Sequence, residues 1–250
     1  MKKQMIKKLD KYSYSSFRQI NGEGPRTYDV HGIRLPSVTT ILSASQSKEK
    51  RQSLANWRAR EGVTRANKIM NESALRGTSM HKYLENYVLG KGYEDMTDLG
   101  QKAKSMAQKV IDTGFLAIDG YYGSEVTLYY PGLYAGSTDL VCSFNGRESI
   151  VDFKQSNRPK RVEWVQDYFL QGAMYVMAHN YVYKSNVEQF VIMMCTPDLY
   201  YQQFEIGGFE LKKYQHKALE RINEYYELVN GAGTTVQVSA EEFIKGKIKT

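Results

Sequence analysis

The chain has 250 residues, of which 42% are hydrophobic and 24% are charged. This balance is typical of a globular protein with a buried core and excludes fibrous and disordered classes. The formal net charge is +7, which suits a polyanionic partner such as a nucleic acid and argues against an acidic one. No apolar run approaches the roughly 20 residues that cross a bilayer, so we expect no membrane association.

Cysteine usage and the start of the chain indicate an intracellular setting. The sequence has two cysteines, Cys142 and Cys195, too few to hold a four-cysteine iron–sulfur cluster. Residues 1–11 are rich in lysine but lack the apolar segment of a secretion signal and the arginine and serine pattern of a transit peptide. We therefore expect a reducing, cytoplasmic location, in a bacterium or a phage-infected cell, and no mitochondrial address.

The first part of the chain predicts a hairpin at His31-Gly32, followed by helices between about residues 37 and 89. Residues 48–68 carry seven lysines and arginines against two glutamates. Within this segment, Trp57 and Arg58 are candidate contacts for single-stranded DNA, because aromatic rings stack on bases and basic side chains bind phosphates. The alternative is a solvated helix face with Trp57 in the core.

Residues 73–89 have the spacing of an amphipathic helix. Its apolar face carries Met80, Leu84 and Val88. His81 and Glu85 lie four residues apart and therefore share another face. Gly77 precedes His81 by one turn, and a glycine inside a helix can permit close approach of another backbone at a cost of about 1 kcal/mol. The alternative for His81 is an ordinary histidine paired with Glu85.

A helix over about residues 97–113 is expected to precede three consecutive strands. The strands cover residues 121–130, 133–144 and 148–154. Pro131-Gly132 and Asn145-Gly146 mark the turns between them. Asp139 lies in the second strand and Asp152 in the third, so a meander could bring the two carboxylates together. Two such charges cost free energy unless a cation lies between them.

Lys154 returns to the same side of the strand as Asp152, because side chains alternate with a period of two, and Phe153 packs behind them. Hydrolysis of a phosphodiester requires a hard cation such as Mg²⁺ or Mn²⁺, which carboxylates bind. Asp-x-Lys is a weak signal alone, because an aspartate and a lysine at a strand end often form only a solvated pair. The alternative is a sheet whose polar residues face water.

A further helix is expected over residues 162–180, with Gln171 and Tyr175 four apart on one face. An amide and a phenol there can steady a lysine or bind a phosphate, and they can equally cap a core. Lys160 and Arg161 end the basic loop before this helix, where we expect phosphate contacts. Strands near residues 187–195 and 200–206 and a helix over residues 210–229 follow.

Four short motifs occur in a fixed order. They are Gly77-x-x-x-His81, Gly136-x-x-Asp139, Asp152-x-Lys154 and Gln171-x-x-x-Tyr175. In this order the chain resembles the RecB-like exonuclease branch of the PD-(D/E)XK nuclease superfamily. Residues 36–42, 152–156 and 159–160 are most similar to the group formed by the mitochondrial genome maintenance exonuclease and its phage and bacterial relatives. Thr138 stands where the superfamily's name has proline, a departure that is common in this branch.

The resemblance implies a fold and a site. The expected class is α/β, with a restriction-endonuclease-like αβββαβ core, a mixed central sheet flanked by helices and an N-terminal helical extension. The resemblance also implies a set of metal ligands, namely His81, Asp139, Asp152 and the carbonyl of Phe153. Lys154 would orient or deprotonate the attacking water. Gln171 and Tyr175 would support Lys154 and the DNA backbone. Glu85 could orient His81, and Glu125 lies on the same sheet.

The predicted organisation has three parts. Residues 1–70 would form a hairpin and a basic helical wall of a DNA channel, residues 71–230 the nuclease core, and residues 231–250 a C-terminal extension. The predicted function is a Mg²⁺- or Mn²⁺-dependent DNA exonuclease that prefers single strands or free ends, in phage or bacterial replication, recombination or repair. The alternatives are a flap endonuclease, a nucleic-acid-binding module, and a nuclease subunit dependent on a helicase, polymerase or single-strand-binding protein.

Overall fold

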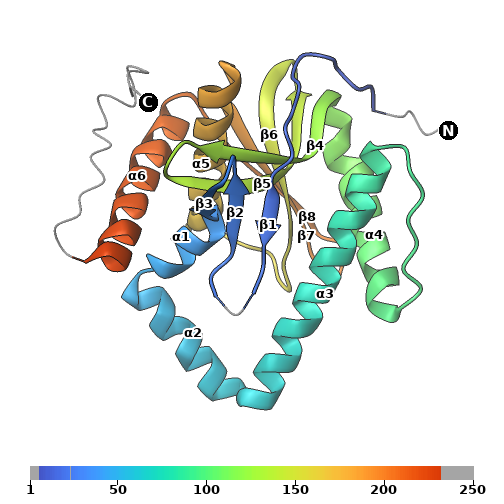
Figure 1. Cartoon of the computed structure of the whole chain (residues 1–250). Coiled ribbons are helices and arrows are strands. Elements are labelled where there is room, and N and C mark those ends of the chain that lie inside the picture. The colour runs from blue at the N-terminus through green and yellow to red at the C-terminus, as the bar shows by residue number, and fades with distance from the viewer. Residues whose placement is uncertain (1–5, 23, 232–250) are drawn as a thin grey trace.

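The protein is described by a computed structural model that covers residues 6–22 and 24–231. The expected C-terminal extension therefore lies outside the described residues from residue 232 onward. A five-stranded sheet forms the centre, with helices on both faces (Figure 1). Its strands, in spatial and chain order, are β4 (Ile118–Tyr130), β5 (Tyr134–Phe144), β6 (Arg147–Gln155), β7 (Gln189–Cys195) and β8 (Tyr201–Gly207).

The central sheet is mixed. Strand β6 pairs with β7 in parallel, and every other neighbouring pair of this sheet is antiparallel. A parallel pair needs a crossover, which helix α5 (Gln166–Tyr183) supplies between β6 and β7. Together with α4 (Asp98–Thr113) before β4, this confirms the expected α-β-β-β-α-β order.

The turn between β5 and β6 follows from its two residues. Asn145 and Gly146 have φ angles of 49° and 74°, the left-handed conformation that a two-residue hairpin turn requires. The expected hairpin is thereby confirmed. It places the second and third strands of the meander side by side, with Leu140 opposite Val151.

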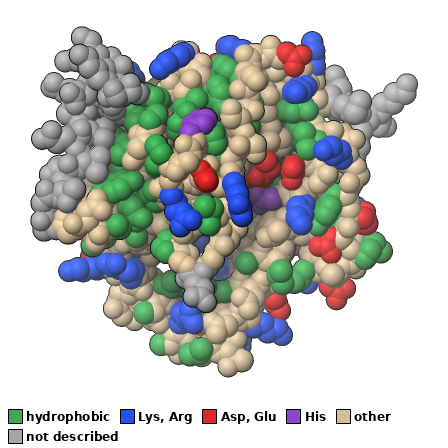
Figure 2. Space-filling model, in the orientation of Figure 1, with side chains coloured by type: hydrophobic (Ala, Val, Ile, Leu, Met, Phe, Trp, Pro, Cys, Tyr) green, Lys and Arg blue, Asp and Glu red, His purple; other side chains and the backbone are tan. Residues whose placement is uncertain are grey.

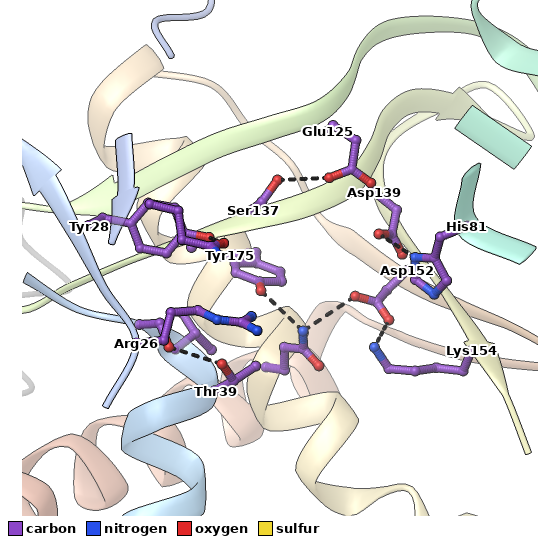
Figure 3. A pocket seen from close by; sticks show the side chains of 15 residues that line it. Arg26, Tyr28, Thr39, His81, Glu125, Ser137, Asp139, Asp152, Lys154 and Tyr175 are labelled. Carbon is purple, nitrogen blue, oxygen red and sulfur yellow. Dashed lines mark hydrogen bonds and ion pairs between the residues drawn. The ribbon is translucent and has the colours of Figure 1, made fainter. Parts of the chain in front are cut away.

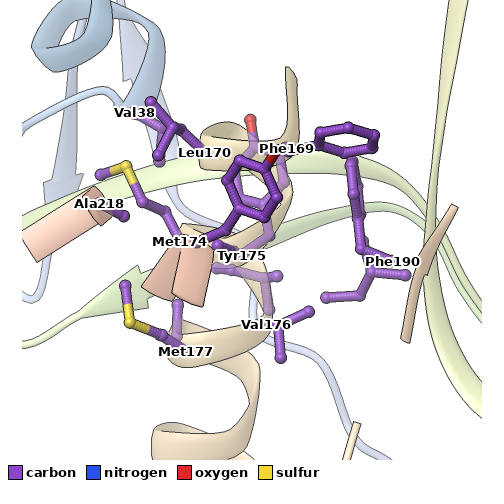
Figure 4. Close-up of a cluster of buried hydrophobic side chains, with 14 of the residues drawn as sticks. Val38, Phe169, Leu170, Met174, Tyr175, Val176, Met177, Phe190 and Ala218 are labelled. Atoms are coloured by element: carbon purple, nitrogen blue, oxygen red, sulfur yellow. The ribbon is translucent and has the colours of Figure 1, made fainter. Parts of the chain in front are cut away.

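Two layers of helices cover the sheet. On one face, α3 (Val63–Val88) and α4 pack on a core that includes Met80, Leu84 and Met106. On the other face, α5 lies between the sheet and helices α1 (Val38–Ala44) and α6 (Gly208–Asn230) (Figure 4). Strand β7 is buried along its whole length, as a central strand covered on both faces must be.

A second, three-stranded sheet precedes these helices and consists of β1 (Arg18–Ile20), β2 (Thr27–Val30) and β3 (Ile33–Pro36). The β2–β3 hairpin at His31-Gly32 was expected and is confirmed. The sheet packs on β5 through Tyr28, Leu35 and Ala135. Strand β1 was not predicted, because three residues are too few to show an alternating pattern.

Two helices differ from their predicted limits. Helix α3 begins at Val63 rather than near residue 73, so the expected boundary at residue 70 falls inside a continuous helix. The helix expected from residue 162 starts with a short 3-10 turn, η2 (Val162–Trp164), and α5 follows from Gln166. Capping signals and apolar periodicity locate the middle of a helix better than its ends.

Helix α2 (Lys48–Glu61) contains no buried residue. Gly62, with a φ angle of 77°, separates α2 from α3, and the two helices form a V in Figure 1. Trp57 is half-buried, so the alternative that placed it in the core is wrong. No helix among the described residues is long and apolar enough to cross a membrane.

Candidate active site

A pocket of about 230 Å³ lies where the small sheet meets the central one (Figure 3). One side carries His81 from α3 and a group of carboxylates from β4, β5 and β6. In Figure 2, acidic and histidine side chains gather near the middle of this face of the molecule, with lysine and arginine side chains on both sides of them.

Asp139 is held by two donors from different elements. Its Oδ1 lies 3.0 Å from His81 Nδ1, and its Oδ2 accepts a hydrogen bond of 2.6 Å from the backbone N–H of Phe153. Burial works against the charge of Asp139, but the imidazole of His81 lowers the pKa of this carboxyl below its usual value. In turn, burial opposes protonation of His81, and Asp139 nevertheless raises the pKa of the imidazole.

Asp152 is 2% exposed and forms an ion pair with Lys154, so the expected placement of both side chains on one side of β6 is confirmed. Burial raises the pKa of Asp152 despite the nearby ammonium group. Burial disfavours the charge of Lys154, while Asp152 and Asp139 raise its pKa above the usual value. Lys154 Nζ also lies 5.0 Å from the centre of the Tyr168 ring, a favourable cation–π arrangement.

Glu125 joins the same side of the pocket through an irregularity of β4. Its φ angle is 51°, unusual for a residue with a side chain, and such strain is often retained at functional sites. Ser137 Oγ donates a hydrogen bond of 3.2 Å to Glu125 Oε2. Although Glu125 keeps solvent contact, partial desolvation, together with Asp139 and Glu85, raises its pKa to about 7.

Three side chains of the pocket form a group that could hold a metal ion. His81, Glu125 and Asp139 each offer one ligand atom, and these atoms all lie within 4.8 Å of one another. The buried Oδ2 of Asp152 faces Lys154 and has no hydrogen-bond donor of normal geometry among the described residues. Carboxylate oxygens are the ligands that hard cations prefer, and an imidazole nitrogen is a common ligand of transition metals, so the residues present fit a divalent cation.

Helix α5 contributes two side chains that lie next to the acidic side of the pocket. Gln171 Nε2 donates to Asp152 Oδ1 at 3.4 Å and to Tyr175 Oη at 3.1 Å. Gln171 was expected to support Lys154, but it contacts Asp152 instead. The side chain of Lys154 contacts Asp152 and Tyr168. The face shared by Gln171 and Tyr175 thus positions a carboxylate.

Both motif glycines lie against side chains of other elements. A Cβ atom at Gly136 would come within 2.7 Å of the Tyr175 ring, and one at Gly77 would lie 3.3 Å from Gln155 Cγ. The first distance is impossible without movement, so Gly136 permits α5 to approach β5. The close approach expected at Gly77 involves a side chain of β6 rather than a backbone.

Gln155 connects β6 to α3. Its Oε1 accepts two hydrogen bonds from Arg76, of 3.2 and 2.9 Å, and its amide nitrogen donates to the carbonyl of Ser73 at 3.1 Å. Arg76 is buried, and an unpaired guanidinium there would be costly. The contact therefore fixes the turn of α3 that precedes His81 relative to the strand that carries Asp152.

Six predicted residues lie outside the pocket lining. They are Trp57, Arg58, Glu85, Phe153, Lys160 and Arg161. His81 hydrogen-bonds Asp139 rather than Glu85. The backbone of Lys160 is tied to the Gln202 side chain by hydrogen bonds of 2.7 and 2.8 Å, and Arg161 lies over the Trp164 ring.

The pocket also includes residues that no motif predicted. The wall opposite the acids contains Gln19, Arg26, Tyr28, Ser37 and Thr39. These residues come from the small sheet and the segment that enters α1. Their sequence separation from the acids exceeds 40 residues, and no local spacing could have linked them to the site. For Ser37 and Thr39, the similarity of residues 36–42 to exonucleases was a signal that pointed to this segment.

Relatives of known name match most of this chain. Mitochondrial genome maintenance exonuclease 1 of Mus musculus is 27% identical over 202 residues, which are 77% of this chain and 59% of that protein. The Homo sapiens protein of the same name is 23% identical over 208 residues, 77% of this chain and 58% of that protein. Over these residues the chain is similar to mitochondrial genome maintenance exonuclease 1. The expected resemblance to exonucleases of the PD-(D/E)XK type is thereby confirmed.

The chain spans less than two thirds of the length of these relatives. No model of a protein family matches it. A solved structure of a candidate exonuclease from Eubacterium rectale has a TM-score of 0.47 and 15% sequence identity, over 72% of this chain and 76% of that one. The fold is therefore assigned from the strand order and connections described above.

Proposed function

We propose that this protein is a divalent-metal-dependent exonuclease that hydrolyses phosphodiester bonds of DNA and prefers single strands or free ends. The observation that carries the proposal is the convergence of His81, Asp139, Asp152 and Lys154 in one pocket. The relationship to a named exonuclease supports the same activity. The biological setting that we propose is the replication, recombination or repair of phage or bacterial DNA in the cytoplasm.

In this proposal Mg²⁺ or Mn²⁺ is held by Asp139, Asp152, His81 and the carbonyl of Phe153. Glu125 joins this set, because one of its carboxylate oxygens lies within 4.8 Å of the ligand atoms of His81 and Asp139. When bound, the cation would lower the pKa of a water molecule toward neutrality, polarise the phosphoryl oxygens and offset the repulsion among the carboxylates.

The chain's own side chains account for the remaining requirements of hydrolysis. The ammonium of Lys154, kept charged by Asp152, orients the attacking water and stabilises the negative charge that develops on the phosphate. Gln171 keeps Asp152 in one rotamer through its amide. The buried Tyr175 hydroxyl accepts a hydrogen bond from the same Gln171 amide and so holds it in place.

The N-terminal region is proposed to guide the strand to the pocket. Residues 48–68 carry the basic side chains of α2 and the start of α3, and almost all of them are exposed. Arg58 donates to Asn67 on α3 at 2.8 Å, which ties the two arms of the V together. Helix α2 has no buried residue and most of its basic side chains are exposed, so a wall of a DNA channel is its proposed role.

Cleavage of three end-labelled DNA substrates tests the proposal. Linear single strand, circular single strand and blunt duplex are incubated with Mg²⁺, Mn²⁺ or EDTA, each beside Asp152→Ala. Metal-dependent loss of the linear strand, with the circle spared and the variant inactive, is the expected result. Cutting of the circle would instead identify an endonuclease. Absence of cleavage in every metal would favour a binding module or a subunit that requires a helicase, polymerase or single-strand-binding protein.

A further inference from the structure

Arg26 occupies the pocket wall that faces the acids. It immediately precedes β2, and in Figure 3 its side chain points from the small sheet toward Tyr175 and the acidic side. We propose that Arg26 binds a phosphate of the substrate strand next to the phosphate that reacts, and that the wall around it is a subsite for the sugar–phosphate backbone. This inference rests on the proposed nuclease function and names a substrate contact that the motifs did not include.

The main chain at Arg26 is firmly held. Its carbonyl accepts hydrogen bonds from the backbone N–H of Ser37, at 3.0 Å, and from Thr40 Oγ1, at 2.8 Å. Ser37 Oγ in turn accepts from Thr40 N at 3.0 Å and so caps α1. The backbone that carries the guanidinium is therefore fixed before a ligand binds, so that only the side chain remains to be ordered.

The charge of Arg26 is not neutralised within the described part of the chain. Two cationic side chains line the pocket, and Lys154 is paired with Asp152. None of the ion pairs formed between residues 6–22 and 24–231 involves Arg26. A guanidinium without a carboxylate partner, at the edge of a polar pocket, suits an anion that arrives with the substrate.

The rest of this wall is uncharged and, apart from Val38, polar. Its lining residues between positions 19 and 39 include no acid. Tyr28 Oη donates to Gln19 Oε1 at 2.9 Å, and the Thr39 hydroxyl lies 2.9 Å from Ser37 Oγ. Hydroxyls and amides of this kind commonly contact sugars and phosphates in nucleic-acid complexes. All the carboxylates of the pocket lie on the opposite side, where the reacting phosphate is proposed to bind.

The two sides together define how a strand would lie. A strand whose reacting phosphate contacts the acids continues in both directions, so a neighbouring phosphate meets the wall that carries Arg26. This contact would position the strand without reading its sequence, because a phosphate is the same at every nucleotide. Arg26 is therefore a positioning residue for the substrate, and its loss should weaken substrate binding more than it slows turnover.

The test measures binding of a linear single-stranded oligonucleotide in EDTA, where cleavage does not occur, for wild type, Arg26→Ala, Arg26→Lys and Arg34→Ala. Arg34 is the matched control, because it is an exposed arginine of the same small sheet that does not line the pocket. We expect Arg26→Ala to bind about tenfold more weakly, as removal of one charge-assisted hydrogen bond implies. The salt slope, which is the slope of log K against log salt concentration, should become less steep by about 0.7. Arg34→Ala should behave as wild type.

A neutral methylphosphonate placed at one phosphate at a time identifies the contact. Wild type should lose affinity when the phosphate beside the reacting one is neutralised, and Arg26→Ala should lose nothing further at that position. Equal losses in both proteins at every position would overturn the inference. If wild type binds and cleaves DNA and Arg26→Ala matches it in KM and salt slope, the inference fails while the proposed function stands. If wild type neither binds nor cleaves, both fail.

Discussion

At the scale of single residues, the two aspartates differ in their partners. Asp139 is bound to an imidazole and a backbone N–H, whereas Asp152 is bound to an ammonium and an amide. Both carboxylates are therefore held in one orientation before any substrate arrives, and such preorganisation is a major source of rate enhancement.

Lys154→Ala should lower kcat by about 10²–10⁴-fold, the usual contribution of a positioned proton-transfer group. Mn²⁺ binding, measured by calorimetry, should persist, because the proposed ligands remain. Lys102→Ala is the control, since Lys102 is an exposed lysine of α4 outside the acidic pocket. Cleavage by Lys154→Ala at nearly the wild-type rate would show that the assigned role of Lys154 is wrong.

The burial of His179, which lies outside the proposed site, predicts that the free energy of unfolding depends on pH. Its side chain is fully buried, with Nε2 2.9 Å from Tyr14 Oη and Nδ1 2.6 Å from Ser185 Oγ. Burial lowers the pKa of His179 to about 4, below the usual value of about 6.5. Between these values the unfolded chain takes up a proton that the folded chain does not, so the free energy of unfolding falls as pH falls, by roughly 3 kcal/mol at most.

Urea unfolding at several pH values between 4 and 7 measures how the free energy of unfolding depends on pH. His179→Gln keeps a donor and an acceptor but does not titrate, so its free energy of unfolding should decrease less over that range than that of wild type. His216→Gln changes an exposed histidine of α6 and should leave the wild-type dependence intact. Identical pH profiles for wild type and His179→Gln would contradict the assignment.

At the scale of elements, the approach of α5 to the central sheet depends on a glycine. A Cβ atom at Gly172 would lie 2.2 Å from Phe190 Cδ1 on β7. The same helix carries Gln171 and Tyr175 into the pocket, so packing at Gly172 also determines how far these side chains lie from Asp152.

Gly172→Ala should destabilise the protein by about 1–3 kcal/mol through overpacking, which outweighs the gain of roughly 1 kcal/mol from alanine's helix propensity. The free energy of unfolding in urea measures the change. Gly92→Ala, where the added atom meets nothing within 4 Å, should be nearly neutral. Replacing Phe190 with leucine in the Gly172→Ala protein should recover part of the stability, and a stabilised Gly172→Ala would refute the tight contact.

At the scale of the whole molecule, the V formed by α2 and α3 extends below the small sheet of β1, β2 and β3 in Figure 1. Asp167 anchors the open end of the α2 arm, because it pairs with Lys50 at the start of α2 and with Arg221 of α6 at 3.5 Å. Arg221 also donates to the carbonyl of Leu42 at 2.6 Å. The helix without a buried residue is thus attached to α5 at its first turn through an ion pair.

Combined replacement of Arg51, Arg60 and Arg65 by serine should weaken binding of single-stranded DNA and reduce its salt slope by up to about 2, or about 0.7 for each phosphate that is no longer neutralised. The melting temperature should change little, because all three side chains are exposed. Replacement of Lys102, Lys109 and Lys213, on α4 and α6, removes the same charge elsewhere. Equal effects of the two sets would mean that net charge, not a channel wall, attracts DNA.

Local sequence patterns determined much of this protein. The alternation of β6 alone places Asp152 and Lys154 on one side, Asn145-Gly146 sets the turn that aligns two strands, and helical periodicity identifies the buried face around Met80. These features follow from geometry within a few residues, where backbone periods of 2 and 3.6 decide which side chains share a face.

Only the tertiary structure decided which faces meet. Glu125 enters the acidic group through an irregular strand, Gln171 contacts Asp152 instead of Lys154, and Arg26 faces them from a separate sheet. The segments involved lie far apart in the chain, and their contacts depend on how whole helices and sheets pack. A spacing rule describes neighbours along one element and carries no information about the element across the pocket, which is why the acids were predicted and the opposite wall was not.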